Sequence, residues 1–402
     1  MISKSVSLKC PNDYFLKFYF FKRKSAFYDN RKPFLLITSK EKTLSLRLNM
    51  SKEQQFAPTL LAWYGINGRE LPWRKTTNPY FIWLSEIILQ QTRVEQGMSY
   101  WHKFVERYGT VEQLATASED AVLLLWQGLG YYFRARNMRV AAQQVVEMGG
   151  FPTTSKELQQ LKGVGVYTAS AIASFAFNEQ VAVVDGNVYR VLARYFGIDA
   201  PIDDRKGKEL FEQLAQRLLP HKDSAQYNQA IMDFGALQCV PASPNCMQCP
   251  LMETCDAFRN NKVAALPVKQ KKVKKQNVLL NYVYLQYKGK TALMRRGKGD
   301  IWNGLWQPLL LEDLLQQPIE PSTECKTLQK HYPQAVQVVK ELKHLLTHRT
   351  VFANMFFIRL EQEITLPEPY LWVKEDEIEQ YAHSRLVELL LEKVRDYLGA
   401  NH

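Results

Sequence analysis

A group of four cysteines within 17 residues constrains this chain more than any other feature. The spacing is C-x6-C-x2-C-x5-C, formed by Cys239, Cys246, Cys249 and Cys255. Four thiolates in so short a loop suit either a tetrahedral zinc ion or a cubane iron–sulfur cluster. The other two cysteines stand alone, so the pattern does not resemble a disulfide framework. We therefore predict a metal-binding loop in an intracellular protein, with the choice of metal open at this point.

The hydrophobic pattern changes its period once along the chain. Residues 50–261 carry apolar side chains at three- and four-residue spacing, as in Val181–Phe196 and Ser224–Leu237, which predicts an all-α region. Residues 262–276 contain six lysines and no acidic residue, which indicates a solvated linker. Residues 277–402 mix strand-like and helical runs and predict a second, α+β domain.

Three segments carry the α+β prediction. Asn277–Arg296 has the composition of two strands around a Lys-Gly-Lys turn. Val351–Leu360 is expected to form a further strand, and Arg385–Leu398 a helix. No uncharged apolar stretch is long enough to predict a membrane span.

The net charge of +12 is concentrated in residues 1–49, which hold 11 basic and 3 acidic residues and so contribute +8. The basic total is therefore weak evidence for a polyanionic partner. Because residues 1–49 show no periodic pattern, we expect a disordered extension that precedes the natural start at Met50 and is dispensable. An organelle transit peptide is the alternative, given the basic, acid-poor composition.

A Gly-x-Gly turn opens the Ala-rich helix predicted within Leu161–Phe177. Free backbone amides at such a helix start form an anion site suited to a phosphate. We expect Gly163 and Gly165 to form the turn, with Val164 and Thr168 beside the phosphate. An ordinary structural turn is the alternative, because G-x-G before a helix is a weak signal by itself.

Two carboxylates lie in contexts that differ from a solvated surface. Glu86 sits in an apolar helix within Leu71–Thr92, and partial burial there would raise the pKa of its carboxyl toward neutrality, as a general acid requires. A surface position is the alternative. Asp185 precedes a helix in Val184–Gly197, where a helix N-cap is the plain interpretation. The same carboxylate can both cap the helix and stabilise a cation.

Seven motifs closely resemble those of the MutY-type adenine DNA glycosylases, in the endonuclease III helix-hairpin-helix superfamily. They are LPWR, NPY-x-x-WLSE-x-x-LQQT, W-x-GLGYY-x-RARN, GVG, VDGNV, NQA-x-MD-x-GA and the cysteine loop, in the family's order between about Met50 and Lys269. The resemblance implies an all-α helix-hairpin-helix glycosylase domain with an iron–sulfur cluster loop, followed by an α+β Nudix-like domain. It also implies that the four cysteines hold a [4Fe–4S] cluster; a structural zinc stays the alternative.

The resemblance assigns roles to four residues near the reacting nucleotide. Glu86 would protonate adenine at N7, and Asp185 would stabilise the oxocarbenium-like sugar, with brief covalent bonding. Asn187 would help to order Asp185 and the attacking water. Tyr167 occupies the position of the lysine that forms a Schiff base in bifunctional relatives. A phenol cannot form an imine, so we predict a monofunctional enzyme in which Tyr167 assists.

The resemblance further implies contacts around an extruded base. Gln91 and Tyr131 would insert into the DNA beside the lesion, and Thr92 and Leu129 would contact the oxidised guanine. Extrusion itself costs a few kcal/mol of unstacking. Core packing is the alternative for Tyr131 and its neighbour Tyr132.

The likeness of residues 277–402 to the Nudix-like lesion-recognition domain is looser. It rests on GLWQP, Gly304–Pro308, and on the strand pattern. The Glu-rich helix that a Mg²⁺-dependent Nudix hydrolase needs is missing from the sequence after Pro308, so nucleotide hydrolysis is not expected. The family's Phe-Ser-His tip aligns with Leu346, Thr347 and His348, where leucine cannot stack as phenylalanine would. The alternative is that Leu346, Thr347 and His348 lie on an ordinary surface loop without a special role.

Taken together, the sequence predicts an adenine glycosylase that acts on double-stranded DNA containing A:8-oxoguanine or A:G mispairs. We expect a cytoplasmic, nucleoid-associated monomer that does not contact a membrane. The two alternatives are an endonuclease III-like lyase for oxidised pyrimidines, against which Glu86 and Tyr167 argue, and a non-catalytic DNA-binding module.

Overall fold

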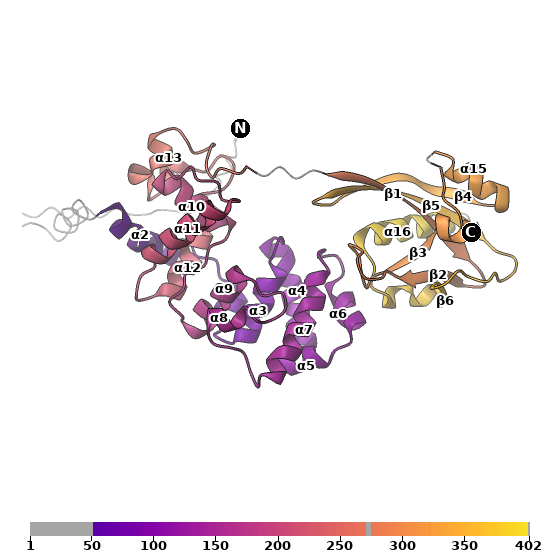
Figure 1. Cartoon of the computed structure of the whole chain (residues 1–402), viewed down its shortest axis with the longest axis horizontal. Coiled ribbons are helices and arrows are strands. Elements are labelled where there is room, and N and C mark those ends of the chain that lie inside the picture. The colour runs from indigo at the N-terminus through magenta and orange to yellow at the C-terminus, as the bar shows by residue number, and fades with distance from the viewer. Residues whose placement is uncertain (1–50, 271–274, 321, 401–402) are drawn as a thin grey trace, which may run out of the picture. The chain divides into compact units, whose positions relative to one another are not determined.

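The computed structural model describes residues 51–270, 275–320 and 322–400 (Figure 1). The extension predicted for residues 1–49, and part of the predicted Lys-rich linker, lie outside the described residues. No helix in the described part of the chain is long and apolar enough to cross a membrane.

The first described region is helical, as predicted. Its elements are α2 (Lys52–Asn67), η1 (Pro72–Arg74), α3 (Pro79–Ile88), α4 (Val94–Arg107), α5 (Val111–Thr116), α6 (Glu119–Trp126), α7 (Phe133–Glu147), α8 (Ser155–Leu158), α9 (Val166–Phe177), α10 (Gly186–Phe196), α11 (Arg205–Leu218), α12 (Ser224–Asp233), η2 (Phe234–Gln238), η3 (Cys246–Gln248), η4 (Met252–Thr254) and α13 (Asp256–Arg259).

These helices bury two separate apolar cores. One lies among α3 to α9 and includes Trp83, Phe104 and Trp126. The other joins α2 to α10, α11 and α12 around residues such as Phe56 and Phe211, so the first described helix packs with the last ones (Figure 1). Each group of helices buries its apolar side chains in its own core. Polar side chains from both groups line a cavity where the two groups meet.

Two helix starts position groups that matter below. Helix α3 begins after Asn78, whose side chain accepts from the backbone of Tyr80, with Pro79 preset for the first helical position. Helix α10 begins at Gly186 because Asp185 caps it. The helix thus starts directly after Asp185, as the sequence predicted.

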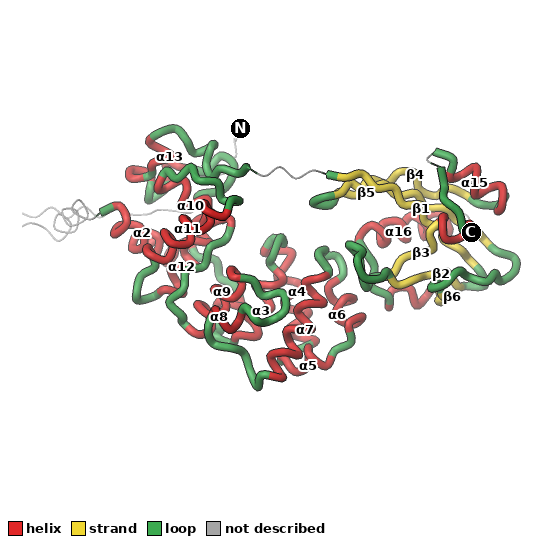
Figure 2. The backbone as a smooth tube through the Cα atoms, viewed as in Figure 1, coloured by secondary structure: helices red, strands yellow, loops and turns green. Residues whose placement is uncertain are grey.

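The second region is α+β and contains the described strands (Figure 2). The strands are β1 (Gln276–Gln286), β2 (Lys290–Arg295), β3 (Trp306–Leu310), β4 (Val336–Leu345), β5 (Arg349–Arg359) and β6 (Leu371–Lys374). They form one sheet in the order β4-β5-β1-β3-β2-β6, with β1 parallel to β5 and the other neighbours antiparallel. The helical elements are α14 (Leu311–Leu315), α15 (Glu324–His331), η5 (Glu375–Gln380) and α16 (Arg385–Ala400).

Alternating side chains of β1 and β5 fill both faces of this sheet. Tyr282, Met355 and their neighbours pack with α16, whereas Val283 and Phe356 pack with α14 and α15. The Lys-Gly-Lys turn between β1 and β2 is confirmed, with Lys288 and Gly289 both at positive φ as a tight hairpin requires.

Candidate active site

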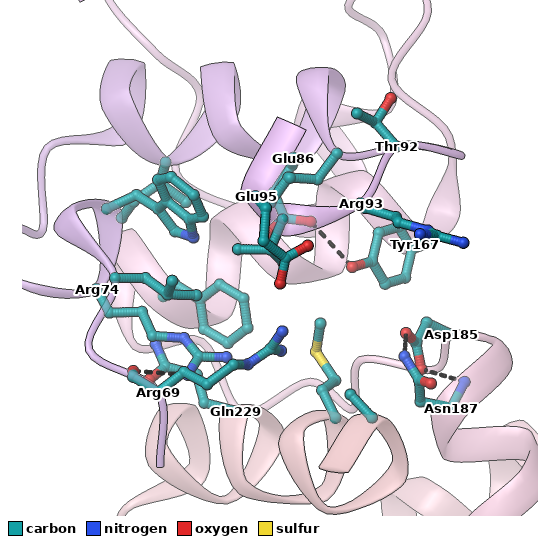
Figure 3. A pocket seen from close by; sticks show the side chains of 18 of the residues that line it. Arg69, Arg74, Glu86, Thr92, Arg93, Glu95, Tyr167, Asp185, Asn187 and Gln229 are labelled. Carbon is teal, nitrogen blue, oxygen red and sulfur yellow. Dashed lines mark hydrogen bonds between the residues drawn. The ribbon is translucent and has the colours of Figure 1, made fainter. Parts of the chain in front are cut away.

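A cavity of about 470 Å³ is lined by helices of both apolar cores (Figure 3). Its walls come from η1, α3, α9, α12 and the start of α10. The polar side chains that line it include Arg69, Arg74, Glu86, Tyr167, Asp185, Asn187 and Gln229. All four residues expected near the reacting nucleotide thus meet in one cavity of the size that a nucleobase needs.

Glu86 reaches this cavity from the apolar helix α3. Its side chain is only 8% exposed, and Oε2 accepts a hydrogen bond of 2.9 Å from the hydroxyl of Tyr167. Burial raises the pKa of the Glu86 carboxyl to about 7; the Tyr167 hydrogen bond opposes the rise, Asp185 adds to it, and Arg74 opposes it. The expectation of a partly buried carboxyl with a raised pKa is confirmed.

Asp185 is held at the N-terminus of α10 by three donors. Oδ1 accepts from the backbone amides of Asn187 and Val188, both at 2.8 Å, and Oδ2 accepts from the Asn187 side chain at 2.7 Å. Burial raises the pKa of Asp185, while these hydrogen bonds lower it. The N-cap interpretation is therefore confirmed, and the capping carboxylate also lines the cavity.

Arg190 fixes Asn187 and connects it to the cysteine loop. Its Nη2 donates to Asn187 Oδ1 at 2.8 Å and to the carbonyl of Gly235, and its Nε donates to the carbonyl of Cys239 at 2.8 Å. A Cβ on Gly235 would lie 2.6 Å from Asn187 Cβ, so glycine permits this close approach. The orientation of the Asn187 amide is therefore set by an acceptor on one side and a donor on the other.

The sequence reasoning missed two arginines that line the cavity, Arg69 and Arg74, and the carboxylate that binds them. Asp233 is fully buried and binds both Arg69 and Arg74. Arg74 contacts both carboxylate oxygens, at 2.7 and 2.8 Å, and Arg69 adds its backbone amide and its guanidinium. Arg74 lies in the LPWR motif and Asp233 in NQA-x-MD-x-GA, but 159 residues separate the two.

The predicted hairpin forms at the start of α9. Gly163 has φ +79 and a Cβ there would lie 2.8 Å from Asn137, so only glycine fits the turn. Gly165 caps the helix in an extended conformation. The side chains of Val164 and Thr168 are buried, and Thr168 accepts from Gln90 at 3.2 Å. A phosphate here would therefore meet backbone amides rather than these two side chains.

The residues expected beside the lesion fall into two surface turns. Gln91 is exposed with φ +59, and Thr92 follows it half-buried. Tyr131 is 41% exposed with φ +48, whereas Leu129 is buried. Neighbouring Tyr132 is buried, so the packing interpretation is right for that tyrosine alone.

The tip of the second domain carries Thr347 and His348 between β4 and β5. The Thr347 hydroxyl lies 2.5 Å from that of Tyr131, and His348 is exposed. Leu346 packs against the apolar core and is partly buried.

The four cysteines line a second, smaller hollow. Cys239, Cys246, Cys249 and Cys255 are all free thiols there. Arg194 lies beside them, with Nη1 3.5 Å from Cys239 Sγ and two further hydrogen bonds to carbonyls of the loop. Within the described residues, no three His, Cys, Asp or Glu side chains converge where a metal ion could be held. The lining itself contains four thiols, no carboxylate and no imidazole.

Comparisons with known proteins agree with this geometry. Residues 84–220 match the family described as HhH-GPD superfamily base excision DNA repair protein, and residues 281–393 match the NUDIX domain. The adenine DNA glycosylase of Buchnera aphidicola subsp. Baizongia pistaciae is 36% identical over 313 residues, covering 75% of this chain and 86% of that protein. The chain belongs to the adenine DNA glycosylase family.

Other members of the adenine DNA glycosylase family are similarly related. The enzyme of Buchnera aphidicola subsp. Schizaphis graminum is 31% identical, covering 78% of this chain and 96% of that protein. The human enzyme is 42% identical over 213 residues, 50% of this chain and 39% of its own length. Among solved structures, a thermostable thymine-DNA glycosylase has a TM-score of 0.49 and 30% identity, covering 52% of this chain and 97% of that chain.

Family membership confirms several sequence predictions. The helix-hairpin-helix domain, the Nudix-like α+β domain and a DNA glycosylase that hydrolyses N-glycosyl bonds are all as expected. The roles of individual side chains, the mispair and the metal stay predictions and are taken up next.

Proposed function

We propose that this adenine DNA glycosylase excises adenine mispaired with 8-oxoguanine or guanine and leaves an abasic site. The observation that carries the proposal is the pair Glu86 and Asp185. Both carboxylates point into one cavity from different elements, and their surroundings differ (Figure 3). A pKa of about 7 lets Glu86 keep a proton at neutral pH. Burial raises the pKa of Asp185 too, but three N–H donors oppose that rise and favour its ionised form.

The proposed reaction assigns each group one task. Glu86 donates its proton to N7 of the extruded adenine as the bond from C1′ to N9 breaks and its electron pair moves into the base. The Asp185 carboxylate offsets the positive charge that develops at C1′, in a buried site where such an interaction is strong. Water ordered beside Asn187 then adds to C1′, and its proton restores the Glu86 carboxyl. Tyr167 orients Glu86 through their hydrogen bond.

The same site supports the absence of lyase activity. Tyr167, at the position of the Schiff-base lysine in bifunctional relatives, is half-buried and donates to Glu86, and desolvation raises the pKa of its phenol above the ordinary value. A neutral phenol cannot attack C1′ to form an imine. We therefore expect the DNA strand to break after excision only on treatment with alkali or heat.

Binding to duplex DNA is assigned to three surfaces. The Gly163–Gly165 turn offers backbone amides to a phosphate, which positions the duplex without reading its sequence. Gln91 and Tyr131 project from surface turns and are proposed to fill the space of the extruded adenine. Thr92, Leu129, Thr347 and His348 are proposed to contact the oxidised guanine, and the enzyme acts as a monomer on the nucleoid.

The cysteine loop is proposed to hold a [4Fe–4S] cluster. Four thiols line the hollow without a carboxylate or an imidazole among its other residues, and the cationic Arg194 would offset the negative charge of bound thiolates. Once bound, the cluster would cross-link the loop from Cys239 to Cys255 against α10. Through Arg190 the loop would also support Asn187.

One assay tests the proposal against its alternatives. Single-turnover cleavage is measured on duplexes with A:8-oxoguanine, A:G or an oxidised pyrimidine, with and without alkali, and with borohydride trapping. We expect alkali-dependent cleavage of the two adenine mispairs and little trapped enzyme. Robust trapping or preferential cleavage at oxidised pyrimidines would favour the lyase, and binding without cleavage would favour a non-catalytic module.

A further inference from the structure

Two surface residues that are not glycine adopt a left-handed backbone. Gln91 has φ +59 and Tyr131 has φ +48, in turns that follow α3 and precede α7. Side chains with a Cβ seldom adopt this conformation unless the surroundings impose it. Both residues are exposed, so core packing of their own side chains does not supply the constraint.

Arg134 lies beneath both turns and is only 4% exposed. Its Nη1 donates to the carbonyl of Gln90 at 2.5 Å, and its Nη2 donates to the carbonyl of Gly130 at 3.3 Å. These are the carbonyls of the peptide bonds that lead into Gln91 and into Tyr131. One guanidinium therefore contacts the peptide immediately before each left-handed residue, and the Gly130 carbonyl also accepts from Nε1 of Trp126 at 3.0 Å.

The same guanidinium is anchored on two further sides. Nη1 also donates to the carbonyls of Ile87 and Ile88, at 2.8 and 3.3 Å, in the last turn of α3, where carbonyls lack helical partners. The Arg134 guanidinium lies 5.0 Å from the centroid of the Trp126 ring and 5.6 Å from that of Tyr131. A helix end, a buried indole and the exposed phenol thus converge on one side chain.

We propose that Arg134 is a positioning residue that sets Gln91 and Tyr131 in their left-handed conformations before DNA binds. The inference rests on the proposed insertion of these two residues into the duplex. Because the two turns are already ordered, the enzyme loses less conformational entropy when the adenine leaves the base stack. A forked guanidinium suits the task because its separate nitrogens reach two carbonyls at once, whereas an ammonium offers one centre.

The test compares Arg134→Lys with Arg139→Lys. Arg139 lies on the same helix and donates to the carbonyl of Ala117 at 2.7 Å, away from both turns, so it is a matched control. Two rates are measured with saturating enzyme: excision from A:8-oxoguanine DNA, and extrusion reported by 2-aminopurine in place of the adenine. We expect Arg134→Lys to slow both at least tenfold, while Arg139→Lys stays within twofold of wild type.

A mutant cycle in the Gln91→Ala/Tyr131→Ala background shows whether Arg134 acts through the two inserted residues. If it does, adding Arg134→Lys slows that background by no more than about threefold. Additive losses, or wild-type rates in Arg134→Lys, would overturn the inference. Unimpaired Gln91→Ala and Tyr131→Ala variants would instead show that the proposed insertion is wrong, and the inference would fall with it.

Hydrogen exchange of the wild-type protein keeps the inference testable should Arg134→Lys not fold. The comparison turn is Lys288–Gly289, which joins β1 to β2 and also has positive φ. We expect amides of residues 89–92 and 129–132 to exchange at least tenfold more slowly than those of the comparison turn. Equal exchange in the three turns would mean that Arg134 does not hold them.

Discussion

The Tyr167 hydroxyl donates a 2.9 Å hydrogen bond to Glu86, joining the start of α9 to the last turn of α3. Burial raises the pKa of the Glu86 carboxyl to about 7, and this hydrogen bond opposes the rise because it favours the ionised form. The bond therefore both aims the acid and limits how strongly it holds its proton. That balance leads to a prediction about pH.

Tyr167→Phe removes the hydrogen bond and leaves Glu86 buried. The pKa of Glu86 then rises, so the acid stays protonated to higher pH and the alkaline fall of the excision rate moves to higher pH. The rate at neutral pH should fall about tenfold because Glu86 is no longer oriented. A pH–rate profile under single turnover checks both effects. An alkaline limb that stays in place or moves to lower pH would show that Tyr167 does not act on Glu86.

Asp233→Asn should shift the alkaline fall of the excision rate to lower pH, opposite to the effect of Tyr167→Phe. Asp233 neutralises Arg69 and Arg74, and Arg74 lowers the pKa of Glu86. Without the carboxylate, the uncompensated guanidinium charge stabilises ionised Glu86, and the alkaline fall begins at lower pH. Breaking a buried ion pair should also cost about 3–5 kcal/mol of unfolding free energy. Denaturant titration measures that loss of stability. An alkaline fall of the excision rate at the wild-type pH would mean that Asp233 has only a structural role.

Asp185→Asn separates the charge of this residue from its role as a helix cap. Asparagine caps about as well as aspartate, so the melting temperature should change little, while excision should fall by several powers of ten. Asp185→Ala is the matched variant that should also lose about 0.5–2 kcal/mol of stability. If Asp185→Asn excises adenine normally, the cap is the residue's whole contribution.

The metal assignment predicts a brown protein that absorbs at about 400 nm and holds about four irons. Replacing Cys239 with serine should remove most of the iron and, through Arg190 and Asn187, impair the catalytic site. Elemental analysis of protein purified without oxygen makes the measurement. Stoichiometric zinc with negligible iron would contradict the assignment.

The sequence predicted those parts of the molecule that depend on local patterns. The helical region, the strand-rich second domain, the cysteine loop and the two carboxylates all carry signals within a few residues of each site. The start of α10 directly after Asp185 was also predicted, because an N-cap residue is a local signal in the sequence.

Contacts between distant segments could not be predicted in this way. Arg69 and Arg74 bind Asp233 from 164 and 159 residues away, and Arg134 reaches carbonyls more than 40 residues earlier. The burial of Val164 and Thr168 depends likewise on how α9 packs. No spacing along the chain encodes which buried guanidinium meets which carboxylate or carbonyl, since tertiary packing decides it.

Glu86→Gln tests the central claim most directly. Glutamine keeps the shape of the side chain but cannot donate the acid's proton to adenine. We predict that single-turnover excision from A:8-oxoguanine DNA falls by several powers of ten, while the dissociation constant for that duplex stays within about tenfold of wild type. Excision by Glu86→Gln at a rate near that of the wild-type enzyme would contradict the account.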